Sequence, residues 1–305
     1  MNDTARGGIL LFAALVWAGA VVVLANELAP LVLGQDPTDS IWRNGFFTLF
    51  LFGLLAAPPL VLLGRRHAWS TLRGVALGRW TGLGLAMGVG GFTITMSYAW
   101  FAGVLIPAAA GWVGFVPFAF GTLVVLFQSA SEELFFRGWL QSDLEKRWEP
   151  RWALAATAIG FAALHVIGGA RAPLSLINLL LGGVLFGLLA QRSGGLAASI
   201  AAHGGWNWAE QMVFGTDPNP GRTAFGALFD HDLLGNPLWG GSPEGINASI
   251  AMTIVLAALI APVVALSRRH SSLYPATDEG GASLHAQNMW SSASKPAVSS
   301  GRTVS

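Results

Sequence analysis

The sequence predicts an all-α fold, a polytopic integral membrane helical bundle of about eight transmembrane helices. Of the 305 residues, 53% are hydrophobic and only 11% are charged, whereas soluble domains carry about 25% charged residues. So few charges cannot cover the surface of a water-soluble protein of this length. The 13 tryptophans and 39 glycines are also typical of membrane bundles.

Apolar segments long enough to cross the hydrocarbon core, about 20 residues each, divide the chain. We expect spans near 8–29, 45–64, 81–103, 112–139, 151–169, 173–191, 195–215 and 246–267. Residues 1–110 then hold the first three transmembrane helices, and 111–269 form the core of the same membrane domain. Residues 216–245 are expected to be an outer loop. The Ser-, Ala- and Gly-rich residues 270–305 are expected to be a disordered tail.

The basic residues predict the orientation of the bundle. If the N-terminus is cytoplasmic, most loop Arg and Lys residues are cytoplasmic too, and only Arg43, Arg171 and Arg222 lie outside. This asymmetry follows the positive-inside rule, so we expect both termini in the cytoplasm. We also expect the protein in a bacterial inner membrane. The net charge of +1 argues against a nucleic-acid partner. The absence of cysteine excludes thiol catalysis and cysteine metal sites.

Two glutamates and an arginine lie within the fourth expected span. Placing an ionised group in hydrocarbon costs several kcal/mol, so such groups face a bundle interior. Gln128 and Glu132 are four residues apart on one helix face, and Glu133 and Arg137 have the i,i+4 order of an intrahelical ion pair. Such a pair leaves Glu132 as the carboxyl group free to exchange a proton. The alternative is that both glutamates lie at the interface and only hold a loop.

Two later spans each supply a histidine. His165 follows Phe161 by one helical turn, and Ser199, His203, Asn207 and Gln211 recur every four residues. Lipid would exclude this polar face, so it must face the bundle interior or a water-filled cavity. A helix-to-helix hydrogen bond at His165, and a polar zipper along the second face, are the structural alternatives.

Together these side chains have the composition of a hydrolytic centre. Glu132 and His165 could hold and deprotonate a water, and His203 and Asn207 could donate hydrogen bonds to an oxyanion. Alternatively, Glu132, His165 and His203 could ligate zinc, although no HExxH sequence is present. At 1.5 Å rise per residue, Glu132 and His203 lie about 12 Å from the inner ends of their spans, and His165 about 20 Å. A shared site therefore requires helix tilt, or a fifth helix that begins deeper in the bundle.

At these residues the chain resembles the CPBP intramembrane protease family, the CAAX prenyl protease and bacteriocin-processing proteins, also called Abi or type II CAAX endopeptidase-like. The family motifs EExxxR, FxxxH and HxxxN match Glu132–Arg137, Phe161–His165 and His203–Asn207 in order. The resemblance covers about residues 115–215.

This resemblance implies a catalytic core within 111–269, with a cavity open towards the cytoplasm where a peptide bond is cleaved at membrane depth. It implies that Glu132 and His165 activate the water and that His203 and Asn207 form the oxyanion hole. Glu133, Arg137, Phe161, Gln128 and Ser199 would support these four residues. The expected partners are the lipid bilayer and a peptide or membrane-protein substrate. Both zinc-dependent and metal-free members are described, and we favour no cofactor here.

Two other functions fit the same residues. A proton- or ion-coupled transporter could use Glu132, His165 and His203 as a relay. A catalytically silent membrane scaffold could keep the same fold. The sequence does not fix the substrate or the oligomeric state.

Overall fold

A computed structural model describes residues 2–34, 40–62, 74, 76–108, 112–221 and 223–265. The predicted tail at 270–305 lies outside the described residues, as do Arg222 of the predicted outer loop and the end of the eighth expected span.

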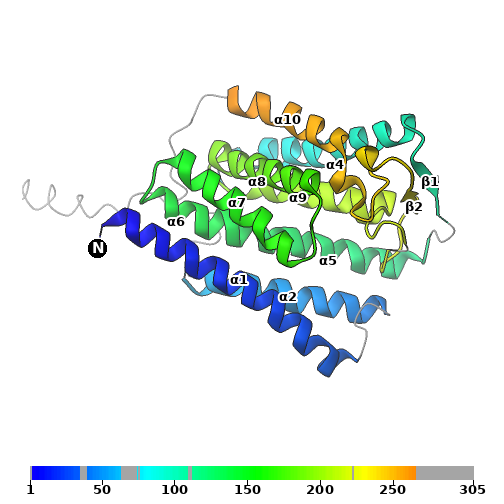
Figure 1. Ribbon diagram of the computed structural model, residues 1–305. Coiled ribbons are helices and arrows are strands. Elements are labelled where there is room, and N and C mark those ends of the chain that lie inside the picture. The colour runs from blue at the N-terminus through cyan, green and yellow to red at the C-terminus, as the bar shows by residue number, and fades with distance from the viewer. Residues whose placement is uncertain are drawn as a thin grey trace, which may run out of the picture. The chain divides into compact units, whose positions relative to one another are not determined.

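The described part of the chain is mostly helical (Figure 1), which confirms the predicted all-α membrane class. Its α-helices are α1 (Asp3–Leu33), α2 (Ile41–Leu62), α4 (Leu77–Phe101), α5 (Phe115–Glu133), α6 (Ser142–Glu145), α7 (Pro150–Ile167), α8 (Pro173–Ser193), α9 (Ala197–Trp208) and α10 (Ile250–Ala265). Among the described residues, five helical segments are long and apolar enough to cross a membrane: α1, α2, Phe115–Glu145, α7 and α8. The total of eight spans stays a prediction.

A small two-stranded sheet is the part that the sequence analysis missed. Strand β1 (Leu105–Pro107), between the third and fourth expected spans, pairs antiparallel with β2 (His231–Leu233) of the expected outer loop. The buried Asn219 side chain holds this loop, because Leu233 N donates to its Oδ1 at 2.6 Å and its Nδ2 donates to Leu233 O at 3.0 Å. Short 3₁₀-helices, η3 (Pro237–Trp239) and η4 (Gly245–Ala248), lead into α10.

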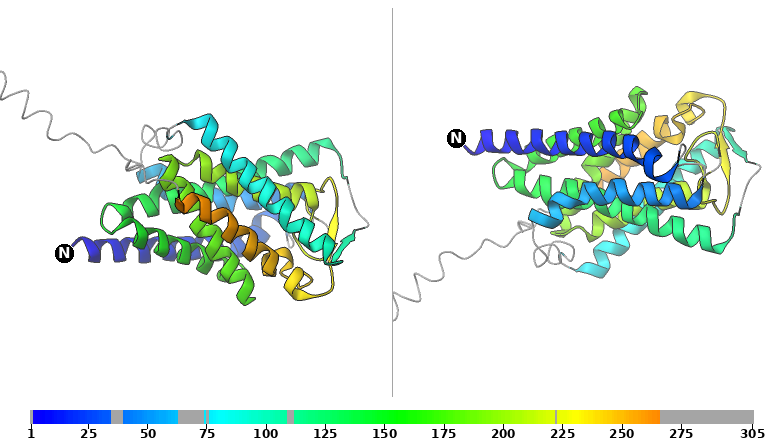
Figure 2. Two further views of the ribbon diagram at one scale, coloured as in Figure 1. Left: turned by 90° about the horizontal axis from the view of Figure 1, so that it is seen from above. Right: turned by 90° about the horizontal axis from the view of Figure 1, so that it is seen from below.

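The long helices lie side by side, with the sheet at one end of the bundle and α6 and the N-terminus at the other (Figure 1). Helices α1 and α2 run next to each other along one side (Figure 2). Helix α1 buries a stripe of small side chains, Ala14, Ala18, Ala25 and Ala29, and exposes large apolar ones such as Phe12. Small residues allow close helix packing in membranes, and large apolar ones suit a lipid-facing surface.

A close helix contact positions α9, which carries His203 and Asn207. Gly84 and Gly88 of α4 lie against α9, where a Cβ atom on either glycine would overlap the carbonyl oxygen of Ala198 or Ala202. Only glycine permits this approach of two backbones.

Two π-helices follow the segments that carry the motifs. The π-helix η1 (Leu134–Gln141) begins directly after Glu133, and η2 (Ala209–Phe214) begins directly after α9. The Ser142 hydroxyl bridges the carbonyl oxygens of Arg137 and Gly138, at 2.8 and 3.0 Å. Wide helical turns of this kind are frequent at functional sites, and η1 carries the arginine of the first motif.

The α4–α9 contact predicts a large difference between two glycine substitutions on one helix. Gly88→Ala should lower the free energy of unfolding by about 1–3 kcal/mol, because the added methyl group overpacks the interface. Gly90→Ala is the matched control, because no atom lies within 4 Å of its added Cβ. Thermal unfolding in detergent, followed by tryptophan fluorescence, measures both. Equal melting temperatures for the two variants would contradict the contact.

Candidate active site

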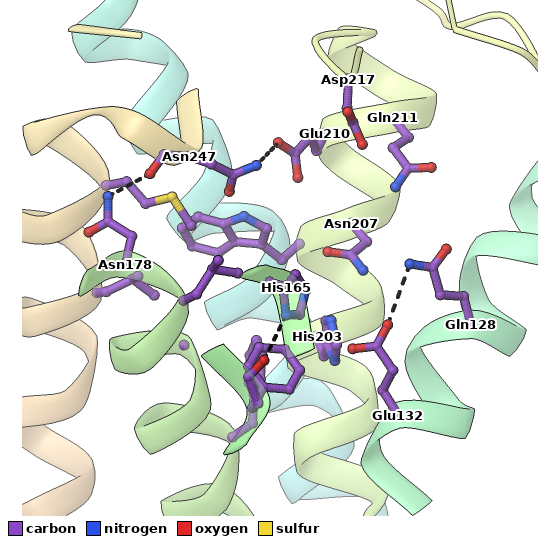
Figure 3. Close-up of a pocket in the computed structure, with 17 residues that line it drawn as sticks. Gln128, Glu132, His165, Asn178, His203, Asn207, Glu210, Gln211, Asp217 and Asn247 are labelled. Atoms are coloured by element: carbon purple, nitrogen blue, oxygen red, sulfur yellow. Dashed lines mark hydrogen bonds between the residues drawn. The ribbon is translucent and has the colours of Figure 1, made fainter. Parts of the chain in front are cut away.

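The four residues expected to be catalytic line a single cavity. This central cavity has a volume of about 200 Å³, and Glu132, His165, His203 and Asn207 all lie in its wall. Figure 3 shows Glu132 from α5 and His203 and Asn207 from α9 around the space that His165 also enters. His165 lies in the last turn of α7, so the depth offset expected from the sequence does not keep it from this cavity.

Glu132 is buried with little hydrogen bonding. Its side chain is 4% exposed, and its Oε1 accepts one long hydrogen bond, 3.4 Å, from Gln128 Nε2. Among the described residues, its Oε2 has no hydrogen-bond partner. A buried carboxylate oxygen left without a partner costs about 1–3 kcal/mol or more. The Glu132 carboxylate can therefore accept a hydrogen bond from a molecule in the cavity.

Glu133 joins α5 to two other groups. Its Oε1 accepts a hydrogen bond from Arg137 Nη1 at 2.8 Å and another from His203 Nδ1 at 2.8 Å. The Glu133–Arg137 pair expected from the i,i+4 spacing is present, and both side chains are 0% exposed. The sequence analysis missed the bond to His203, which lies 70 residues away in the chain. Glu133 therefore orients one of the cavity imidazoles as well as binding the arginine.

Aromatic rings surround the buried Arg137 guanidinium. Its Cζ atom lies 4.8 Å from the ring centroid of Phe161 and 5.6 Å from that of Phe186. Its Nη2 donates to Gly183 O of α8 at 3.0 Å. Cation–π contacts and a backbone hydrogen bond offset part of the cost of burying this charge.

The hydrogen bonds of the two histidines fix which ring nitrogen faces the cavity. His165 Nδ1 lies 2.8 Å from Phe161 O, and His203 Nδ1 lies 2.8 Å from the Glu133 carboxylate. A carbonyl and an ionised carboxylate only accept hydrogen bonds, so Nδ1 carries the proton in both rings. In each ring Nε2 is then the atom left for a bound molecule. Phe186 stacks on the His203 ring with centroids 4.6 Å apart and holds its plane.

Of the supporting residues expected from the sequence, Gln128 and Phe161 line the central cavity and Ser199 does not. Ser199 Oγ donates to Leu196 O at 3.0 Å in the first turn of α9. Ser129 is the serine that supports a residue of the cavity wall, because Asn207 Nδ2 donates to Ser129 Oγ at 3.2 Å.

Part of the cavity wall carried no motif in the sequence. Asn178 of α8 and Asn247 of η4 come from segments without a recognisable pattern. Gln211 lies on the polar face of His203 and Asn207 that the sequence indicated, and Glu210 lies beside that face; both line the cavity. The wall residues outside the three motifs include Asn178, Phe186, Trp206, Glu210, Asp217 and Asn247.

An apolar groove reaches the same site from the N-terminal helices. This α1–α2 groove has a volume of about 330 Å³ and is lined by side chains that include Val22, Phe47 and Leu51. Glu132 and His165 lie in its wall as well as in that of the central cavity. The site is therefore bordered by an apolar surface on one side and a polar one on the other.

The donor types suit zinc, but their spacing does not. Two imidazoles with free Nε2 atoms and one carboxylate are the set of many catalytic zinc sites. Within the described residues, however, no three His, Asp or Glu side chains come close enough together to hold a metal ion.

The buried ion pair predicts a clear stability effect. Arg137→Met should lower the free energy of unfolding by about 3–5 kcal/mol, because it leaves the Glu133 charge buried without its cation. The double variant Glu133→Gln/Arg137→Met should recover part of that loss. The matched control is Arg151→Met, whose ion pair with Glu149 is 64% exposed on both sides and contributes about 0–1 kcal/mol. Unfolding titrations in mixed detergent micelles measure the four proteins.

A loss at Arg137 no larger than that at Arg151 would contradict this account of the ion pair.

The comparisons with known proteins support the motif assignment. Residues 114–209 match the family model described as Type II CAAX prenyl endopeptidase Rce1-like. The matched segment contains all three motifs and begins after α4, so α1, α2 and α4 lie outside it. The chain has no significant match among the curated proteins or the solved structures. Over residues 114–209, this chain is therefore similar to the type II CAAX prenyl endopeptidase-like family that its three motifs predict.

Proposed function

We propose that this protein is an intramembrane endopeptidase that hydrolyses a peptide bond with a water activated by Glu132 and His165. The family match supports a membrane peptidase of the CAAX type as the general class. The observation that carries the proposal is the buried Glu132 carboxylate, with one oxygen unpartnered among the described residues, in a cavity wall shared with His165, His203 and Asn207.

In the proposed first step, Glu132 and His165 hold the water from two sides. The carboxylate accepts one proton of the water as its oxygen attacks the carbonyl carbon of the peptide bond. His165 Nε2 accepts the hydrogen bond of the other proton, since His165 Nδ1 already donates to Phe161 O. Glu132 then returns its proton to the leaving amine nitrogen, so that the C–N bond breaks and the carboxylate is restored.

His203 and Asn207 stabilise the oxyanion that forms on the carbonyl oxygen. Asn207 has a second N–H besides the one that binds Ser129. His203 donates through Nε2 only when its ring carries both protons, and its Nδ1–H bond to Glu133 keeps the ring in place. Glu133 and Arg137 act through His203 and are positioning residues.

The substrate is a peptide or membrane protein with an apolar segment. The α1–α2 groove offers that segment an apolar surface that leads to Glu132. A bacterial inner-membrane location is part of the proposal. The cytoplasmic position of both termini is part of it too, and rests on the distribution of basic residues.

Glu132→Gln should abolish proteolysis and leave the fold intact. Removing a general base costs about 10²–10⁴-fold in rate, and the amide keeps the size of the side chain. New protein termini that appear in cells with the wild-type protein should be absent from cells with Glu132→Gln. Asn207→Ala should slow their formation by about 10²–10³-fold, the effect of losing one oxyanion donor.

Glu149→Gln is the matched control, because Glu149 is an exposed residue paired with Arg151 outside the central cavity. It should give the wild-type set of termini. If Glu132→Gln and wild-type cells have the same termini, the protein is not a peptidase. Proton-coupled flux that Glu132→Gln abolishes would then favour the carrier, and an unchanged phenotype would favour the scaffold.

Chelation should leave the activity in place. We propose proton transfer by side chains without a metal. A strong zinc chelator should therefore change the cleavage rate by less than about twofold, whereas losing the base lowers it by about 10²–10⁴-fold. Metal analysis of the purified active protein should find zinc well below one atom per chain. Stoichiometric zinc, with activity lost on chelation and restored by Zn²⁺, would replace this mechanism with a zinc-dependent one.

A further inference from the structure

A second polar region lies in the central cavity, beyond the residues of the three motifs. Glu210 of η2 and Asp217 line the cavity together with Asn247. Figure 3 shows Asp217 beside Glu210, farther along the same chain segment than His203 and Asn207. Both carboxylates also line an adjoining cavity of about 350 Å³, the loop-side cavity, which His165 borders too. Glu210 is 5% exposed, whereas Asp217 is exposed.

The two carboxylates have no cation of their own in the described part of the chain. No Lys, Arg or His side chain described here forms an ion pair with either of them. Glu210 Oε1 accepts only a long hydrogen bond, 3.4 Å, from Asn247 Nδ2. By contrast, Glu244 Oε1 in the wall of the loop-side cavity accepts two short hydrogen bonds, from the backbone amides of Arg171 and Ala172 at 2.9 and 2.7 Å.

Two buried polar groups in the same walls give an independent indication of a ligand. Trp206 lines the central cavity and is 4% exposed, and Thr216 lines the loop-side cavity and is 2% exposed. Neither Trp206 Nε1 nor Thr216 Oγ1 has a hydrogen-bond partner among the described residues. Buried polar groups are normally hydrogen-bonded. Each is therefore a group that a polar atom of a ligand would satisfy.

We propose that Glu210 and Asp217 form a subsite for a cationic group of the substrate, an ammonium or a guanidinium. The inference rests on the proposed function and narrows its substrate class. Glu210 lies seven residues beyond His203 on one helical path, about 10 Å along it. An extended peptide covers this length in about three residues. The cation therefore lies about three residues from the cleaved bond.

At this position the proposed subsite favours Lys, Arg or a free α-amine of the substrate.

Cleavage of synthetic peptides by the purified full-length protein tests the subsite. The peptides share one sequence except at the positions near the cleaved bond. Each of these positions carries Lys, Arg, Gln or Glu. At one position, about three residues from the bond, we expect Lys and Arg to be preferred over Gln by about tenfold, since hydrogen bonds to charged groups contribute about 1.5–3 kcal/mol. A second set with acetylated N-termini separates a side-chain cation from a free α-amine.

Three variants and one control carry the comparison. Glu210→Gln and Asp217→Asn should each reduce the Lys-to-Gln ratio to near one, and Asp217→Lys should turn the preference towards Glu. Asp217 is exposed, so its variants still test the subsite if the buried Glu210→Gln variant fails to fold. Glu149→Gln should keep the wild-type ratio.

A binding measurement separates failure of the subsite from failure of the proposed function. The acetylated tripeptide amide Ala-Leu-Lys should raise the melting temperature of the wild-type protein more than Ala-Leu-Gln does, and Asp217→Asn should remove the difference. Cleavage that needs Glu132 but has a Lys-to-Gln ratio near one would overturn the subsite and leave the peptidase. A charge-dependent shift without any cleavage would keep the subsite and overturn the peptidase. No difference in either measurement would overturn the subsite.

Discussion

The arrangement of the site depends on one buried carboxylate, that of Glu133. It binds Arg137 within its own helical segment and His203 of α9 across the bundle. A buried charge is tolerated only when it is paired and hydrogen-bonded, so the three groups need one another. The same bonds that make burial tolerable also fix the ring of His203 at the wall of the central cavity. Stability and site geometry therefore depend on the same contacts.

Helix packing brings the partners of this carboxylate within reach. The approach of α4 to α9 at Gly84 and Gly88 holds α9 at the depth where His203 meets Glu133. Gly183 of α8 supplies a carbonyl to Arg137, and Phe186, one turn later, stacks on His203. The hydrophobic effect contributes little to helix association inside a membrane. Close packing of small residues and such hydrogen bonds therefore stabilise the bundle. The central cavity then remains where polar side chains meet and packing stops.

The sequence predicted the class of fold and the contacts within the first motif, because both depend on local rules. Hydrophobic length located the helices, and i,i+4 spacing placed Gln128 beside Glu132 and paired Glu133 with Arg137. Contacts between distant segments could not be predicted in this way. The bond of His203 to Glu133, the strands β1 and β2, and the place of Asn178 and Asn247 in the cavity wall all depend on how separate segments pack. Ser199 shows the converse limit of spacing, since it shares the face of His203 but lies in the first turn of α9 and bonds to the backbone there.

The central claim is that Glu132, His165, His203 and Asn207 surround one bound water inside the membrane. An experimental density map of the protein in a lipid bilayer, at a resolution that reveals ordered water, tests this most directly. The account predicts a water within hydrogen-bond distance of the Glu132 carboxylate and His165 Nε2, with His203 Nδ1 on Glu133. A map in which these side chains face the lipid, or in which His203 has left Glu133, would contradict it.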